Sequence, residues 1–172
     1  MLPEPWAAFL AAVDAALPKP VVLHCIGGFV LTFVYGSPRN TGDIDYIVQI
    51  PNDVDIDSLA GKGSALARKH KVYFERVTIN QMPENYDERL REMLAGEFKN
   101  LRLLAPDPYD LILSKLERAG PKDRDDADYL FKSLQLDAAT LRERYQELRV
   151  NLGRPTREDL TLDLWLDLFT TN

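Results

Sequence analysis

The sequence predicts an α+β protein in which a small mixed β-sheet with flanking helices is followed by a C-terminal helical bundle. In the first part of the chain, short β-branched runs such as "VVLHCI" and "DIDYIVQI" alternate with segments of helical periodicity. Beyond about residue 106 the apolar spacing is helical throughout, and Pro121, Asp137 and Pro155 separate the segments. We therefore expect an α/β core over residues 1–106 and a helical subdomain over residues 107–172.

The expected elements of the core begin with a helix in "PWAAFLAAVDAAL", which Pro18 ends. "VVLHCI" is then a buried strand, Gly27 and Gly28 follow it, and "FVLTFVY" is a short helix. After the turn "SPRNTG", "DIDYIVQI" is a second strand. Its alternation predicts one face with Ile44, Tyr46 and Val48 and an opposite face with Asp43, Asp45 and Ile47.

The remaining elements of the core are a helix over Ile56–His70, a strand in "KVYFERVTI", a helix in "PENYDERLREML" and a last, edge strand in "NLRLLA". In the helical subdomain the periodic segments are "YDLILSKLERA", "RDDADYLFKSL", "AATLRERYQELRVNL" and "TREDLTLDLWLDLF". The last of these either covers the sheet or docks a partner.

The composition restricts the classes of partner and compartment. The formal net charge of −6 over 172 residues disfavours a broad basic face for duplex DNA. The single cysteine, Cys25, lies in an apolar run and is expected to be a buried structural thiol. The N-terminus lacks a basic region and contains Glu4 and Asp14, so we expect no secretory signal, and no apolar run is long enough to span a membrane. We expect a cytoplasmic protein.

The paired aspartates Asp43 and Asp45 are the first candidate site. Two carboxylates on one strand face lie roughly 6–7 Å apart and repel each other. A bound Mg²⁺ or Mn²⁺ removes this difficulty, because hard cations take carboxylate oxygens and still leave positions for substrate phosphates. A third carboxylate on a neighbouring strand would complete such a centre, and we nominate Glu75 in "YFERV". The alternatives are a solvated strand with Asp43 capping the turn, and a Glu75 that points into water.

The glycine pair Gly27 and Gly28 is the second candidate site. Glycines between a strand and a helix allow backbone N–H groups to approach phosphate oxygens closely. The alternative is a plain turn at the end of a strand. Together with the acids, the pair favours a site for a metal-bound nucleoside triphosphate.

The order strand, Gly-Gly, helix, turn, Asp-x-Asp strand resembles the nucleotidyltransferase superfamily of DNA polymerase β, with matches at Gly27, Gly28 and Asp43–Tyr46. The segment "PRNTGDID" resembles more narrowly the minimal bacterial nucleotidyltransferases allied to the AbiEii toxins. These often carry Arg-x-Thr before the acidic pair, matched by Arg39 and Thr41. The resemblance implies a nucleotidyltransferase-type sheet.

The second half of the chain extends this resemblance through "APDPYDLILSKLERAGPKDRDDADYLF". Lys115 matches a helical lysine of those families, and Lys122, Asp123 and Asp126 match the cluster that follows it. The resemblance implies that Lys115 contacts the nucleotide phosphates, with Asp126 also at the nucleotide, and that Asp123 orients the lysine or takes part in transfer. The alternatives are an exposed helix lysine and a helix start with Asp123 as N-cap.

The implied function is Mg²⁺-dependent transfer of a nucleoside monophosphate from an NTP to an acceptor hydroxyl on tRNA, a protein or a small molecule. The resemblance also implies a toxin role with an antitoxin partner. The alternatives are an inactive nucleotide-binding or partner-binding module of the same fold, and a structural subunit.

Overall fold

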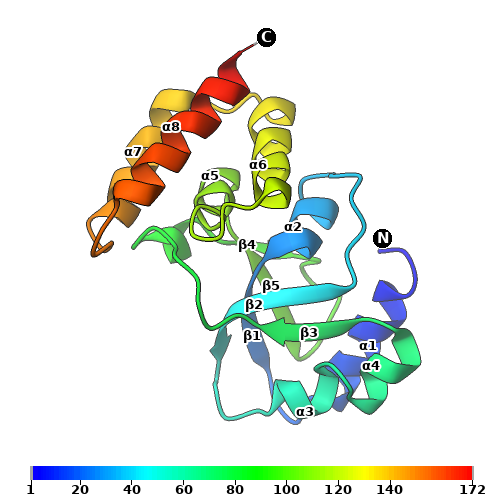
Figure 1. The fold of residues 1–172 in the computed structure, drawn as a ribbon. Coiled ribbons are helices and arrows are strands. Elements are labelled where there is room, and N and C mark those ends of the chain that lie inside the picture. The colour runs from blue at the N-terminus through cyan, green and yellow to red at the C-terminus, as the bar shows by residue number, and fades with distance from the viewer. Residues whose placement is uncertain (1, 172) are drawn as a thin grey trace. The chain divides into compact units, whose positions relative to one another are not determined.

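The computed structural model describes residues 2–171, and its α+β architecture confirms the predicted class. The chain forms two compact units (Figure 1). The first consists of the chain up to Thr78 together with Leu90–Ala105, and the second of Ile79–Arg89 together with the chain from Pro106 onward. The division into independent domains at residue 106 stays a prediction.

The first unit is built on a five-stranded mixed sheet of order β3-β2-β1-β5-β4. Strand β1 pairs antiparallel with β2 and parallel with β5, β2 pairs parallel with β3, and β4 pairs antiparallel with β5. The strands are β1 Val21–Ile26, β2 Asp43–Ile50, β3 Tyr73–Arg76, β4 Arg91–Met93 and β5 Leu101–Ala105. The helices are α1 Trp6–Ala16, α2 Gly27–Phe33, α3 Ile56–Ala60 and α4 Ala65–His70.

Three predictions for residues 56–105 were wrong. The helix expected over Ile56–His70 is two helices, because the "GKGS" segment interrupts it and Ser64 caps α4 by accepting a hydrogen bond from the N–H of Ala67 at 3.1 Å. The helix expected in "PENYDERLREML" is a 3₁₀ turn, η1 Tyr86–Arg89, followed by β4. Because β4 pairs with β5, the strand in "NLRLLA" is internal and not at the edge.

The alternation in β2 holds as far as Tyr46. Ile44 and Tyr46 are buried, whereas the two aspartates lie on the half-buried opposite face. The pairing with β1 then skips Ile47, since Val48 lies opposite His24 and Tyr46 opposite Cys25. This bulge reverses the alternation, so Gln49 is buried in place of Val48 and donates hydrogen bonds to the carbonyls of Pro51 and Val54.

An aromatic cluster forms much of the core between the sheet and its helices. Trp6 of α1 lies edge-on to Phe29 of α2, with 4.9 Å between ring centroids, and Phe9 packs against Phe74 of β3 at 5.6 Å. Cys25 is completely buried, as expected of a structural thiol. Burial of these aromatic side chains stabilises the packing of α1 against α2 and against β3, the neighbour of the strand that carries the aspartates.

The second unit is helical, with α5 Pro108–Leu113, α6 Pro121–Ser133, α7 Ala138–Arg149 and α8 Thr156–Thr170. The helix predicted in "YDLILSKLERA" ends early, at Leu113, and a turn follows. The buried Asp110 accepts hydrogen bonds from Arg89 and Arg144, which explains why the η1 segment belongs to this unit.

Within residues 2–171, every helix falls short of the length and apolar content that a membrane span needs.

Candidate active site

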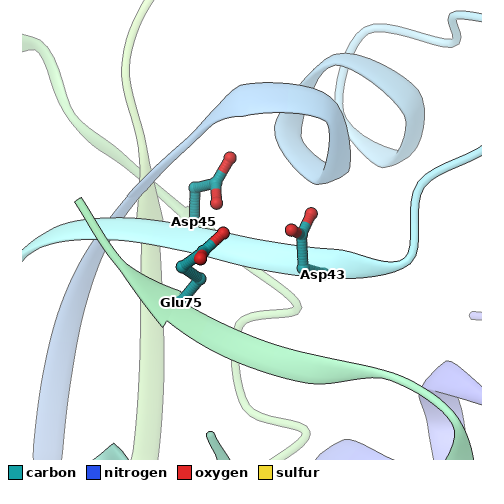
Figure 2. Close-up of side chains that lie close together, drawn as sticks. All are labelled: Asp43, Asp45 and Glu75. Carbon is teal, nitrogen blue, oxygen red and sulfur yellow. The ribbon is translucent and has the colours of Figure 1, made fainter. Parts of the chain in front are cut away.

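Three carboxylates converge on one face of the sheet in the first unit. Asp43 and Asp45 come from β2 and Glu75 from β3, and one oxygen of each lies within 4.8 Å of the others. The parallel pairing sets Asp45 opposite Glu75, and residues in register on adjacent strands point to the same face. Figure 2 shows the three side chains rising from the two strands toward one another. The structure thus brings the nominated third carboxylate to the aspartate pair, although the side chain of Glu75 is also exposed.

The loop before β2 is fixed to α2 and to the first aspartate. The hydroxyl of Thr32 in α2 donates to the carbonyl of Arg39 at 3.0 Å. The hydroxyl of Thr41 donates to the carbonyl of Asp43 at 3.1 Å. These bonds tie the loop to α2 and to the first residue of β2, so they restrain the backbone at Asp43.

The two glycines lie directly against the residues of this site. Gly27 has a φ of +78°, and a Cβ atom built on it would lie 2.5 Å from Oδ2 of Asp45. A Cβ atom on Gly28 would lie 3.2 Å from the hydroxyl of Thr41 and 3.6 Å from the guanidinium carbon of Arg39. Glycine is therefore required at Gly27 by both conformation and space. The arginine, the threonine and both glycines predicted to bind the nucleotide are gathered beside the acids.

Tyr73 lies on the same sheet face as the three carboxylates, but it was not among the site residues predicted from the sequence. It lies opposite Asp43 in the β2–β3 pairing. Burial, the charges of Asp43, Glu75 and Asp45, and a hydrogen bond to Asp43 raise the pKa of its phenol. The ammonium of Lys62 lies 5.9 Å from the centre of its ring. The alternation of "YFER" places Tyr73 beside Glu75, and this signal could have found it.

The donor set of the cluster suits a hard divalent cation. The three carboxylate oxygens lie within 4.8 Å of one another, and rotation of these side chains would bring them closer to a hard cation, whose ligand oxygens lie about 2.0–2.1 Å from it. Cys25 lies near Asp45, but burial and the charge of Asp45 raise the pKa of its thiol, which keeps it protonated. An oxygen-only set of carboxylates favours Mg²⁺ or Mn²⁺ over zinc.

The second unit contains the other predicted site residues. Lys115 is 6% exposed, lies in the turn after α5, and donates to Oδ2 of Asp126 at 3.0 Å. The alternative of an exposed helix lysine is therefore wrong. Its predicted contact with nucleotide phosphates stays a prediction.

Asp123 forms its hydrogen bonds with residues other than Lys115. Its carboxylate accepts hydrogen bonds from Arg118 at 2.6 and 2.7 Å and from the N–H of Gly120 at 3.1 Å. The N-cap of α6 is Gly120, so Asp123 closes the start of the helix from its third position. Burial opposes ionisation, but these bonds and the charge of Lys115 hold the pKa of Asp123 below its ordinary value. The direct partner of Lys115 is Asp126, and the proposed catalytic role of Asp123 stays a prediction.

Comparison with protein families gives one match that spans most of the chain. A family model described as "Nucleotidyltransferase of unknown function (DUF6036)" matches residues 11–161. Searches of curated proteins and of solved structures returned no match. The matched range includes the glycines, the three carboxylates and the Lys115–Asp126 pair.

Proposed function

The chain belongs to the DUF6036 family of nucleotidyltransferases, and on this premise we propose that it uses Mg²⁺ or Mn²⁺ to transfer a nucleoside monophosphate from an NTP to an acceptor hydroxyl. The observation that carries the proposal is the convergence of Asp43, Asp45 and Glu75 within 4.8 Å, directly beside Gly27. Three carboxylates of this spacing on adjacent strands match the requirements of a phosphoryl-transfer centre.

Asp43 and Asp45 would hold the cation, with Glu75 as the third ligand. When bound, the cation neutralises charge on the phosphates and on the oxygen that leaves. Tyr73 donates its hydroxyl hydrogen to Asp43 and so restricts the rotation of that carboxylate. The bonds of Thr41 and Thr32 restrain the adjoining loop in the same way.

The glycine corner, Gly27 and Gly28, would bind the phosphates that leave as pyrophosphate. It has no side chains that block the approach of a phosphate to its backbone N–H groups. The guanidinium of Arg39 lies over Gly28 and would add a charged donor to the same phosphates.

The transfer step forms one bond and breaks one. The acceptor oxygen attacks the α-phosphorus, and the bond from that phosphorus to the bridging oxygen of the pyrophosphate breaks. The acceptor proton passes to Glu75, and pyrophosphate leaves on the side of the glycine corner. The products are the nucleotidylated acceptor and pyrophosphate.

The finer biological assignments remain part of the proposal. These are a relation to the AbiEii-type toxins, a toxin role with an antitoxin partner, a cytoplasmic location, and tRNA or a protein among the acceptors. The competing function is a module that binds nucleotide without transferring it, and the same assay separates the two.

The test is transfer of label from each α-labelled NTP into a cell extract with Mg²⁺ or Mn²⁺. We expect the wild-type protein to label an acceptor and the Asp43→Ala, Asp45→Ala double variant to lose this activity. Asp125→Ala, which removes a 71%-exposed side chain on α6, is the matched control and retains it. Absence of transfer by the wild type, with nucleotide binding by equilibrium dialysis intact, would identify the non-catalytic module.

A further inference from the structure

The hydroxyl of Tyr73 lies at the acidic cluster of the first unit. It donates a hydrogen bond to the carboxylate of Asp43, which stands opposite Tyr73 in the pairing of β2 with β3. Asp43 is one of the three carboxylates whose oxygens lie within 4.8 Å of one another. In a metal-assisted transfer the acceptor oxygen binds beside the carboxylates that hold the cation. The phenol oxygen of Tyr73 is therefore one hydrogen bond away from the position of an acceptor hydroxyl.

The sheet register places Tyr73 on the side of the cluster that faces away from the glycine corner. Ile26, directly before Gly27, pairs with Asp45 of β2, and the other edge of β2 pairs with β3. Adjacent strands are about 4.8 Å apart, so β3 lies one strand farther from the glycines than the aspartates do. The attacking and leaving oxygens lie on opposite sides of the phosphorus. If pyrophosphate leaves at the glycine corner, an acceptor on β3 attacks from the required side.

Space for a nucleotide attached to this phenol lies along β3. A cavity of about 520 Å³ is lined by Tyr73 and Glu75, and also by Lys62. Tyr73 itself is half-buried, and the ammonium of Lys62 lies 5.9 Å from the centre of its ring. A phosphodiester on the phenol would carry one negative charge, which this ammonium would attract.

The cavity wall carries further charged groups, which are Asp53, Asp55, Asp57 and Arg76. Asp53 is paired with Lys19, and Asp55 caps α3. Burial and the charges of Asp57 and Asp55 raise the pKa of the Tyr46 phenol, so both acids lie near Tyr46. Tyr46 is buried on the sheet face opposite to the cluster. The two acids therefore belong to that face rather than to the surroundings of the Tyr73 hydroxyl.

We propose that the protein transfers a nucleoside monophosphate to its own Tyr73 and thereby limits its own activity. The attached nucleotide would occupy the acceptor side of the cluster. It would also remove the hydrogen bond that orients Asp43, so the modified chain would bind the cation less tightly and would not serve a second acceptor. The proposal rests on the proposed function, because the same cation and the same NTP perform the step.

The step uses no reagent besides the NTP. The phenol oxygen of Tyr73 forms a bond to the α-phosphorus, and the bond from this phosphorus to the bridging oxygen of the pyrophosphate breaks. The pyrophosphate keeps the electron pair of that bond. The phenol proton passes along its hydrogen bond to the carboxylate of Asp43 and from there to solvent.

The experiment incubates the purified protein with each NTP and Mg²⁺ or Mn²⁺, without any other acceptor, and follows the intact mass. We expect a gain of a single nucleoside monophosphate, which tandem mass spectrometry of the peptides locates on Tyr73. Because acceptor and site belong to the same chain, the half-time should not change when the protein is diluted. The affinity of the modified protein for Mn²⁺ should be lower by about tenfold or more, because the group that orients Asp43 is altered.

Tyr73→Phe removes the acceptor oxygen and should show no gain in mass, and Tyr35→Phe is the matched control. Tyr35 is another half-buried tyrosine of the first unit that does not line this cavity, and its variant should gain mass as the wild type does. A nucleotide on another residue, or a half-time that shortens with protein concentration, would overturn the proposal.

Two further outcomes separate this proposal from the function on which it rests. No gain in mass, while label still passes to an acceptor in a cell extract, would overturn self-transfer and leave the transferase function standing. Label on neither the protein nor any acceptor would instead overturn the transferase function itself.

Discussion

Gly27 and Asp45 are in such close contact that the carboxylate Oδ2 would lie 2.5 Å from a Cβ atom on the glycine. This contact joins the end of β1 to the acidic face of β2. A ligand bound by the backbone of Gly27 therefore lies next to a ligand bound by the carboxylate of Asp45. A phosphate and its cation are such a pair of ligands.

Gly27→Ala should therefore abolish transfer and destabilise the first unit. The φ of +78° alone costs a residue with a side chain about 1–2 kcal/mol, and the overlap with Asp45 adds to this cost. Gly42→Ala is the control, since its Cβ atom would meet nothing within 4 Å. Urea unfolding and label transfer measure both effects. An alanine variant as stable and active as the control would refute the close contact.

Tyr73→Phe should weaken metal binding and leave the fold unchanged. The substitution keeps the ring under Lys62 but removes the hydrogen bond that orients Asp43. Loss of a group that orients a metal ligand typically costs about tenfold or more in affinity. Titration with Mn²⁺ measures the change. Tyr109→Phe removes a hydrogen bond from the N–H of Asp137 in the other unit, and its Mn²⁺ affinity should equal that of the wild type.

Asp126→Ala should destabilise the second unit strongly. The substitution leaves the ammonium of Lys115, which is 6% exposed, buried without its carboxylate partner. Removing one member of a buried ion pair costs about 3–5 kcal/mol. Chemical denaturation should detect this loss, whereas the exposed neighbour Asp125 should tolerate alanine with little change. Replacing Lys115 by Met together with Asp126 by Leu should recover much of the stability, and failure to do so would mean that the pair stabilises by another route.

Acid should weaken the start of α6 through Asp123. The folded-state pKa of this group lies below the ordinary value of 3.8, because hydrogen bonds from Arg118 and Gly120 outweigh burial. The ionised group therefore contributes stability above about pH 4, and this contribution is lost as the pH falls through the lowered pKa. Unfolding of the wild type and of Arg118→Gln, measured from pH 7 to pH 2, should differ at neutral pH and converge in acid. A difference that stays constant over this range would contradict the assignment.

Local patterns were enough to predict the acidic face of the sheet. The alternation in "DIDY" put both aspartates on one side, and the nominated Glu75 indeed lies opposite Asp45. The wrong predictions depended on distant parts of the chain. Segment Arg91–Met93 lies in a stretch with a helical pattern, but it forms a strand because it pairs with β5. Several acids follow Lys115, Asp123 and Asp126 among them, and only the packing of α6 selects Asp126 as its partner.

Some features of the site had no signal of their own in the sequence. The bulge at Ile47 arises from the pairing of β2 with β1 and reverses the later alternation. The cavity along β3 requires the α3 segment to fold beside the strand, which no short motif predicts.

The most direct test of the central claim is binding of Mn²⁺, followed by electron paramagnetic resonance, to the wild-type protein and to the Asp45→Asn variant in the presence of a non-hydrolysable NTP analogue. If Asp43, Asp45 and Glu75 bind the cation of the nucleotide, the wild type binds Mn²⁺, and the affinity of the variant for Mn²⁺ is lower by about tenfold or more. Equal Mn²⁺ uptake by the two proteins would contradict the account.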